Sequence, residues 1–192
     1  MPRRSATETA KTRQRILKHA SHEFRARGTS VGIGDLMHEL GLTKGGFYRH
    51  FGSKDDLFVD AIALSFQETS DRFEGIAEAA PRGQARAAII NAYLSQEHLD
   101  HPEAWCTLPS LSPEIGRMSV SVRKRLDSTM LLYAERISKY MKGDTPQERR
   151  QTFMLLFSGM AGTIALVRSF GDPDLQKRAL DLARAHYLSA YA

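Results

Sequence analysis

The chain has 192 residues, of which 42% are hydrophobic, and its formal net charge is +5. This apolar content excludes a disordered tail, and the length fits one ordinary domain or a small domain joined to a larger one. The single cysteine, Cys106, excludes an internal disulfide framework and favours a reducing compartment. No apolar run typical of a signal peptide or a membrane span opens the chain, so we expect a cytoplasmic protein with no membrane partner.

The positive charge is concentrated near the N-terminus. Residues 1–54 contain eleven Lys or Arg against four Asp or Glu, whereas the remaining residues contain 16 against 18. A basic segment on a near-neutral body is typical of a protein that binds a polyanion. Composition alone leaves open that the charge only keeps the protein soluble, so the arrangement of the residues has to decide.

Helical periodicity runs through the N-terminal quarter of the chain. A first helix is expected over residues 9–27, with a possible capping box at 5–8 and with Gly28 as the residue that ends it. A short second helix is expected over residues 33–40, and Gly41 closes it. Both helices are amphipathic, which predicts that they pack together in a small domain.

Two further helix starts follow directly. Thr43 is a good N-cap for a third helix that ends at Phe51, and Ser53 is a good N-cap for a fourth that continues to about Glu78. Three helices with short links, the last pair joined through residues 41–43, have the form of a helix-turn-helix. In that motif the second helix of the pair lies in the DNA major groove.

The segment between Gly41 and Phe58, GLTKGGFYRHFGSKDDLF, has a composition suited to such a groove-reading helix. Phe47 and Phe51 are four residues apart and are expected to face inward. Two glycines at the helix start allow backbone N–H groups to approach phosphates and base edges closely. The cations and the tyrosine that remain on the outer face are Lys44, Tyr48, Arg49 and His50.

This segment resembles the TetR family of bacterial transcriptional regulators, in particular a subgroup with Gly-Gly-Phe-Tyr in the recognition helix. The segment WCTLPSLSPEIGR is similar to a Cys-x-x-x-x-Leu segment of the same subgroup. The resemblance implies an all-α protein of about nine helices. It places a basic flexible arm at residues 1–8, a helix-turn-helix DNA-binding domain at 9–58 and a ligand-binding and dimerisation domain at 59–192. One departure is Gly32, which stands where many members have a Ser or Thr cap that also touches phosphate.

The resemblance also implies how DNA is contacted. Thr43, Tyr48 and His50 resemble residues that hold the DNA backbone, and Lys54 does the same at the start of the next helix. Lys44 and the backbone of its neighbour lie where base edges are read, and a lysine suits the acceptor pair of guanine. The expected DNA-binding residues are Arg3, Arg4, Thr43, Lys44, Gly45, Gly46, Tyr48, Arg49, His50 and Lys54.

Arg3 and Arg4 form a basic arm that would enter a neighbouring minor groove. Tyr48 has the alternative role of a packing residue with its hydroxyl group in water, and Arg49 has that of an ordinary solvated side chain.

Helices are also expected along the rest of the chain, over residues 84–99, 113–141, 146–170 and 173–191, with a short interrupted segment at 105–111. The helix over 146–170 is apolar nearly all round, so it must be buried on more than one side. We expect it to form an isologous dimer face with the last helix. The alternative is that both helices are only monomer core. The expected interface residues are Gly159, Gly162, Leu166, Leu180, Ala183 and Tyr187.

The resemblance further implies a small-molecule effector inside the C-terminal bundle. Aromatic and soft side chains on several helices would accept an apolar or aromatic ligand, although such side chains are also common in plain cores. Trp105 and Cys106 are preferred because their proline-bracketed segment moves more easily than a long helix. The expected ligand-binding residues are Phe66, Tyr93, Trp105, Cys106, Leu108, Met118, Met130, Tyr133, Met154 and Phe157.

Cys106 also allows a different regulator, one that responds to metal or to oxidation through this thiol together with His98 and His101. Those three ligands are one fewer than a structural zinc site normally has, and no second cysteine could resolve an oxidised form. A buried, inert cysteine is therefore favoured, and no metal or cofactor is expected.

The sequence thus favours a ligand-responsive repressor that binds a palindromic operator as a homodimer. Two rival classes remain. An enzyme is disfavoured because no Gly-rich phosphate loop, G-x-S-x-G or H-E-x-x-H motif is found. The second rival is an architectural DNA-binding protein that has no ligand.

Overall fold

The computed structural model describes residues 6–192, so Arg3, Arg4 and the proposed cap Ser5 lie outside the described residues. Within that range the chain forms α-helices, one short 3-10 helix and no strand, which confirms the all-α fold. The elements are α1 Ala6–Arg27, α2 Ile33–Glu39, α3 Lys44–Phe47, α4 Lys54–Ala79, α5 Ala85–Tyr93, α6 Gln96–Asp100, η1 Pro102–Ala104, α7 Leu108–Arg117, α8 Val120–Ser138, α9 Pro146–Arg168 and α10 Pro173–Tyr191.

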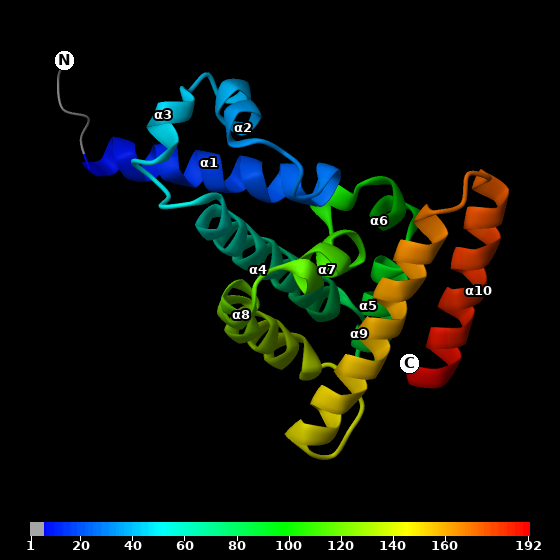
Figure 1. The fold of residues 1–192 in the computed structure, drawn as a ribbon. Helices are drawn as coiled ribbons and strands as arrows, with labels where there is room; N and C mark the ends of the chain where they lie inside the picture. Colours follow the sequence, from blue (N-terminus) through cyan, green and yellow to red (C-terminus); the bar gives the residue numbers. More distant parts are fainter. Residues whose placement is uncertain (1–5) are drawn as a thin grey trace.

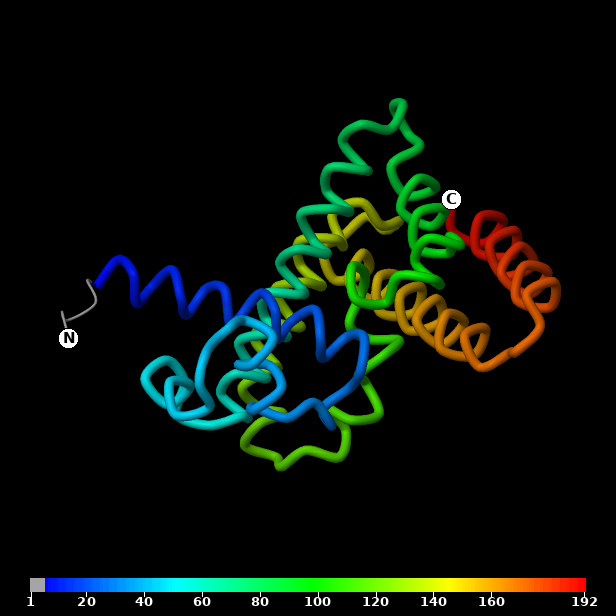
Figure 2. Tube along the Cα trace, turned by 90° about the horizontal axis from the view of Figure 1, so that it is seen from above, coloured from blue at the N-terminus to red at the C-terminus, as the bar shows by residue number. Residues whose placement is uncertain are grey.

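The helices form two connected groups (Figure 1). Helices α1 to α3 gather at one end, where α2 and α3 pack against each other and on α1, and α4 leads from this group into the body. Helices α9 and α10 lie side by side on the other flank, and the view from above in Figure 2 places them at the end opposite to α2 and α3. Helix α4 contacts α1, α5 and α8, so it is the element that joins the two groups.

Local capping explains where several helices begin and end. The hydroxyl of Thr43 accepts a hydrogen bond from the Gly46 amide at 3.3 Å, and the hydroxyl of Ser53 accepts one from the Asp56 amide at 3.0 Å. Gly28 follows α1 with a φ of 77°, a left-handed conformation that favours glycine. The expected roles of Thr43 and Ser53 as N-caps and of Gly28 as the residue that ends α1 are therefore confirmed. Helix α1 begins at Ala6, so the last residues of the expected flexible arm are helical.

The helix expected over residues 84–99 is wrong, because the chain breaks at Leu94. The hydroxyl of Ser95 accepts a hydrogen bond from the His98 amide at 3.1 Å and so starts a new helix, α6. The spacing of apolar residues continues across Leu94, but Ser95 acts as an N-cap within this pattern and so interrupts the helix. This break raises the number of α-helices in residues 6–192 from the expected nine to ten.

The helix expected over residues 113–141 and the interrupted segment at 105–111 are also wrong. Helix α7 already begins at Leu108 and contains Pro113, and the chain is extended at Met118 before α8 starts. Ser119 caps that start with its hydroxyl. Proline is common at the first position of a helix, so Pro113 was expected to start one. It lies instead inside α7, which ends one turn later.

The apolar residues form one cluster that runs from Ile16 in α1 to Leu180 in α10. Phe24 and Phe58 meet edge to face within it, with ring centroids 5.3 Å apart, and fix the first group of helices on α4. Helix α9 is long and apolar enough to cross a membrane by length and composition alone. It packs against α8 and α10 with one face in the core, whereas Met154, Leu155 and Leu166 on its other side are exposed.

Candidate functional site

The expected recognition helix is shorter than predicted. Helix α3 ends at Phe47, and Tyr48 caps it, so Tyr48, Arg49 and His50 lie in the turn that follows rather than in the helix. Two glycines in a four-residue helix explain the early end, since glycine is a poor helix former. The aromatic anchors still define which side of this segment is exposed.

Phe47 and Phe51 anchor the segment from Thr43 to His50 to the core. Both side chains are buried, and their rings stack with centroids 5.6 Å apart. The Arg13 guanidinium of α1 lies 4.6 Å from the centroid of the Phe51 ring. Between these anchors Tyr48 and Arg49 face outward, whereas His50 is half-buried. Tyr48 is 61% exposed, and its ring touches the Phe47 ring only edge-on.

The remaining expected DNA contacts lie on the same exposed segment. Thr43, Lys44 and Arg49 are exposed, and His50 is half-buried. A side chain at Gly45 would meet nothing within 4 Å, so the backbone there is open to a partner. The structure thus brings together the expected residues from Thr43 to His50 on one surface.

Lys54 differs from this expectation because its ammonium group already has a partner. Its Nζ donates to the carbonyl oxygen of Thr29 at 2.5 Å, and the side chain is half-buried. The Thr29 amide in turn donates to a carboxylate oxygen of Glu114 in α7 at 2.7 Å. Lys54 therefore links α4 to the loop before α2. That loop ends at Gly32, which caps α2 without a side-chain hydrogen bond, as expected.

Sequence reasoning missed Arg25, a buried arginine near the end of α1. Its guanidinium donates to the carbonyl oxygen of Trp105 at 3.1 Å and to a carboxylate oxygen of Glu68 at 3.0 Å. Burial lowers the pKa of Arg25 below its usual value, and Glu68 opposes that shift. The only sequence signal was a cation beside Phe24 on the apolar side of α1. Arg25 connects the N-terminal helices directly to the segment that carries Trp105.

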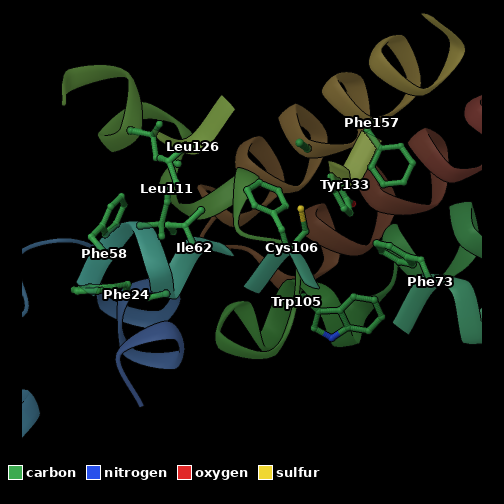
Figure 3. Packing of buried hydrophobic residues seen from close by; sticks show 14 of the residues in the cluster. Phe24, Phe58, Ile62, Phe73, Trp105, Cys106, Leu111, Leu126, Tyr133 and Phe157 are labelled. Carbon is green, nitrogen blue, oxygen red and sulfur yellow. The ribbon is translucent and has the colours of Figure 1, made fainter. Parts of the chain in front are cut away.

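The interior of the body is an array of contacting rings, shown in Figure 3 around the thiol of Cys106. Phe66 and Tyr133 lie 5.0 Å apart between ring centroids, and Tyr133 and Phe157 lie 5.9 Å apart. Phe157 contacts Tyr93 at 5.3 Å. The series continues through His98 to Trp105, whose rings stack at 5.0 Å. Six of the expected ligand-binding residues are buried there: Phe66, Tyr93, Trp105, Cys106, Tyr133 and Phe157.

Four polar atoms of this array are buried without a hydrogen bond of normal geometry: the hydroxyl groups of Tyr93 and Tyr133, the indole Nε1 of Trp105 and Nε2 of His98. The two hydroxyl groups lie beside the Cys106 thiol, which is only a weak hydrogen-bonding partner. An unpaired buried polar group typically destabilises a fold by about 1–3 kcal/mol. Such groups call for an explanation when several occur together. Desolvation raises the pKa values of both tyrosines well above their usual value, so both phenols stay neutral.

His98 is neutral as well. Burial lowers its pKa to about 3, and Nδ1 lies 2.7 Å from the carbonyl oxygen of Tyr93. Because a carbonyl oxygen only accepts, Nδ1 must carry the proton and Nε2 must be an unprotonated acceptor. The interior therefore presents neutral donors and acceptors rather than charges.

A groove opens beside this array between α1, α4 and α8. Its volume is about 630 Å³, and Phe66 and Tyr133 form part of its wall. The α1 residues on its rim are Arg13, Gln14 and Leu17, so the groove touches the N-terminal helices as well as the body. Arg13 is paired there with Asp60 at 2.5 Å.

Four of the expected ligand-binding residues lie outside the array. Met154 is 60% exposed on the outer face of α9, so its assignment to an interior pocket is wrong. The other three, Leu108, Met118 and Met130, are partly buried at the edge of the core.

The metal-responsive alternative is not supported by the geometry. His101 is exposed beside Glu103, whereas His98 is buried, and the two do not form a metal-binding group with Cys106 among the described residues. Burial raises the pKa of the Cys106 thiol, which disfavours the reactive thiolate. One other group in residues 6–192, His19 with Glu23 and Glu39, has suitable spacing, but Arg27 already pairs with both carboxylates.

Some of the expected dimer residues lie at the surface of the protomer, and others lie in its core. Leu166 is 60% exposed, and Gly162 is exposed with open space where a Cβ would stand, so both lie on the outer face of α9. Gly159 faces Tyr187 of the same chain, where a Cβ would clash with the phenol ring. Leu180 is buried in the protomer's own core, so its assignment to the dimer face is wrong. Ala183 is partly buried against that core.

Comparison with known proteins agrees with this architecture. Residues 16–61, from the middle of α1 into α4, match the family model for bacterial regulatory proteins of the tetR family. The transcriptional regulator TtgR of Pseudomonas putida is 32% identical over 98 residues, which are 48% of this chain and 46% of TtgR. The transcriptional regulator AcrR of Shigella flexneri is 38% identical over 66 residues, which are 34% of this chain and 31% of AcrR. The chain therefore matches less than half of the length of either regulator.

Solved structures extend the similarity of fold to the whole chain. The structure of a TetR transcriptional regulator from Chloroflexus aurantiacus J-10-FL superposes with a TM-score of 0.74 and 20% identity, covering 96% of this chain and 98% of that one. At this identity the likeness concerns the fold alone. The protein thus has the fold of TetR-type regulators, and the family's sequence pattern is present in its N-terminal helices.

Proposed function

We propose that the protein is a TetR-family transcriptional regulator, of the subgroup with Gly-Gly-Phe-Tyr in the recognition helix, that represses from a palindromic operator. Residues 9–58 would form the DNA-binding domain and residues 59–192 the effector-binding and dimerisation domain. The observation that carries the proposal is the exposed segment from Thr43 to His50, fixed from below by two buried phenylalanines. We place this regulator in the cytoplasm, without catalytic activity, cofactor or membrane partner.

The DNA contacts follow from the exposed segment. Thr43, Tyr48 and His50 would hold phosphates, and Lys44 and the open backbone at Gly45 would meet base edges in the major groove. Gly46, Arg49, Lys54 and the basic arm with Arg3 and Arg4 would complete the interface. Lys54 is proposed to use its remaining N–H donors for a phosphate while it keeps its bond to the Thr29 carbonyl.

A homodimer would pair the outer faces of α9 and α10 of two protomers. Leu155, Leu166 and Leu182 are 65%, 60% and 75% exposed on these helices. Gly162 leaves space among them for a second helix to approach. Three large apolar side chains in water on adjoining helices support an interface, because burying them would be favourable. A two-fold dimer would match the symmetry of a palindromic operator.

Release from DNA would follow effector binding through two connections. Helix α4 runs from its cap at Ser53 into the ring array at Phe66. Arg25 holds the Trp105 carbonyl from the end of α1. An apolar or aromatic effector that moved these rings would shift both helices and change the spacing of the two recognition segments. Coupling of this kind typically amounts to about 1–3 kcal/mol.

The proposal is tested by selecting DNA fragments with the purified protein and measuring binding in gel shifts. We expect an enriched palindrome whose half-sites are about 34–36 Å apart, or slightly more, bound by two protomers. Failure to enrich any sequence, with a folded protein and a salt-dependent non-specific affinity only, would reject sequence-specific regulation and favour an architectural role.

The dimer face is tested with Gly162→Leu, which places a bulky side chain at the close approach. Light scattering should show loss of the dimer. Lys124→Leu on the exposed surface of α8 serves as a comparison for added apolar bulk away from the proposed interface, and Thr163→Leu, half-buried within the protomer, reports on core disruption. A folded Gly162→Leu protein that stays dimeric removes this face from the interface.

A further inference from the structure

The four unpaired polar atoms of the ring array belong to neutral side chains and lie in two pairs. The hydroxyl groups of Tyr93 and Tyr133 both lie close to Cys106, whose thiol is a weak hydrogen-bonding group. His98 and Trp105 form the second pair on stacked rings next to Tyr93. Phenylalanine would fill the two tyrosine positions equally well as apolar packing, and the Cys106 thiol offers the two hydroxyl groups only a weak hydrogen bond.

The charges around the array indicate which ligands are excluded. Among the described residues no Asp or Glu is buried, so a cationic ligand would find no counter-ion inside the body. Arg168 approaches Tyr93, but its guanidinium donates to the carbonyl oxygens of His98 and Leu99 and to the Ser110 hydroxyl. Arg25 is engaged in the same way, so every guanidinium nitrogen of both arginines already donates a hydrogen bond and an anion would compete with these bonds.

The route into the array is given by the groove between α1, α4 and α8. Tyr133 forms part of the groove wall, while its hydroxyl group is buried beside Cys106. The tilted ring pair of Phe66 and Tyr133 is therefore the boundary between the groove and the interior. Movement of the Tyr133 side chain would join the groove to the unpaired hydroxyl groups, and Figure 3 shows how close this side chain lies to Cys106.

We propose that the interior beside Cys106 binds an uncharged aromatic molecule whose oxygen atom forms hydrogen bonds with the hydroxyl groups of Tyr93 and Tyr133. This inference rests on the proposed effector site and defines its ligand class. The aromatic part of the molecule packs among Phe66, Phe73 and Phe157, and its oxygen gives the two phenols a stronger hydrogen-bonding partner than the Cys106 thiol. Loss of a hydrogen bond to such a buried group reduces affinity strongly, which makes the site selective.

The test uses four probes of one ring system: β-naphthol, naphthalene, β-naphthoate and β-naphthylmethylammonium. Binding to the full chain is measured by calorimetry, and thermal unfolding is measured with and without each probe. We expect β-naphthol to bind at least tenfold more tightly than naphthalene and than either charged probe. Equal affinity for β-naphthol and naphthalene, preference for a charged probe, or binding of none of them overturns the proposal.

Tyr93→Phe and Tyr133→Phe separate a binding role from a structural one. Each removes only a hydroxyl group, so the melting temperature without ligand should stay the same or rise, because an unpaired buried group is removed. The affinity for β-naphthol should fall to the level of naphthalene in both variants. Tyr140→Phe, which removes a partly exposed phenol far from Cys106 in sequence, is the matched control and should bind as the wild type does.

The same preparations distinguish this proposal from the regulatory one. If β-naphthol binding is lost in neither tyrosine variant while the selected operator is still bound in gel shifts, only the ligand class is wrong. If β-naphthol binds as expected but no operator is enriched, only the proposed function is wrong. If both proposals are correct, β-naphthol should lower the affinity of the protein for the operator. The operator should then lower the affinity for β-naphthol by the same factor.

Discussion

The N-terminal helices and the interior of the body present their functional groups in opposite ways. In the first region the candidate residues are exposed, and buried phenylalanines below them fix the surface. In the second region the candidate residues are themselves buried, and their polar atoms lack partners. A surface that meets a large, highly charged partner can be complete in the free protein. A site for a small molecule inside a core is completed only when the molecule supplies the missing hydrogen bonds.

The comparison also shows how the regions are joined. Lys54 and Arg25 each donate to a backbone carbonyl oxygen, of Thr29 and Trp105 respectively. The Arg25 bond joins α1 to the ring array at Trp105, and the Lys54 bond joins the start of α4 to the loop before α2. Movement of the array would therefore act on α1 first and through it on the N-terminal helices.

The largest effect is expected from removing an anchor of the exposed segment. Phe47→Ala should lower the free energy of unfolding by about 3–5 kcal/mol, because the side chain is fully buried, and should abolish specific DNA binding. Tyr48→Ala, its exposed neighbour, should leave stability nearly unchanged and weaken DNA binding only. Chemical denaturation and gel shifts measure the two properties. Equal losses of stability in both variants would contradict the assignment of Phe47 as a buried anchor and Tyr48 as a DNA contact.

Arg25→Ala tests the link between the regions. The variant leaves the Trp105 carbonyl without its donor and opens space near Glu68, so the free energy of unfolding should fall by about 2–3 kcal/mol. Because Trp105 is the only tryptophan in the chain, its fluorescence reports the change directly. Arg27→Ala, an exposed cation two residues further along, should have a small effect on both readouts. An unchanged emission spectrum in Arg25→Ala would mean that the segment is held by other contacts.

Acid should destabilise the body through His98. Its folded-state pKa of about 3 lies below the unfolded value of 6.5, so between these values the unfolded chain binds more protons and stability falls as the pH is lowered. From pH 7 to pH 5 this group alone should reduce the free energy of unfolding by about 2 kcal/mol. Denaturation of wild type and His98→Gln at both pH values isolates the effect, since the other titrating groups are shared. Parallel pH profiles would show that His98 becomes protonated in the folded state.

The smallest effect, and the most specific, is expected within the DNA-binding surface. Lys44→Ala should reduce discrimination at particular base pairs by about 1 kcal/mol. Lys54→Ala should weaken binding to all sequences alike and reduce the salt slope by about one. Both are measured by titration of the selected operator and of mismatched versions at several salt concentrations. Identical behaviour of the two variants would remove the distinction between base-reading and backbone contacts.

The sequence determined much of the N-terminal region because its signals are local. The Thr43 and Ser53 caps bond amides three residues away, and glycines with positive φ close α1 and α2, so each boundary is encoded where it occurs. The pair Phe47 and Phe51 defined the buried side of the exposed segment by spacing alone. Local signals failed where they conflicted: Ser95 and Ser119 start helices inside patterns that periodicity would have continued.

The interior of the body was decided by tertiary structure. The sequence predicted Tyr93, Tyr133 and Trp105 as ligand-binding residues, but only packing of α4, α5, α8 and α9 determines that their polar atoms have no hydrogen bond of normal geometry. In the same way the sequence predicted both Leu166 and Leu180 at the dimer face, yet Leu180 is buried and Leu166 is exposed, because the face that each helix turns inward depends on neighbours distant in sequence. A hydrogen bond such as that from Arg25 to Trp105 spans 80 residues, and no local pattern encodes it.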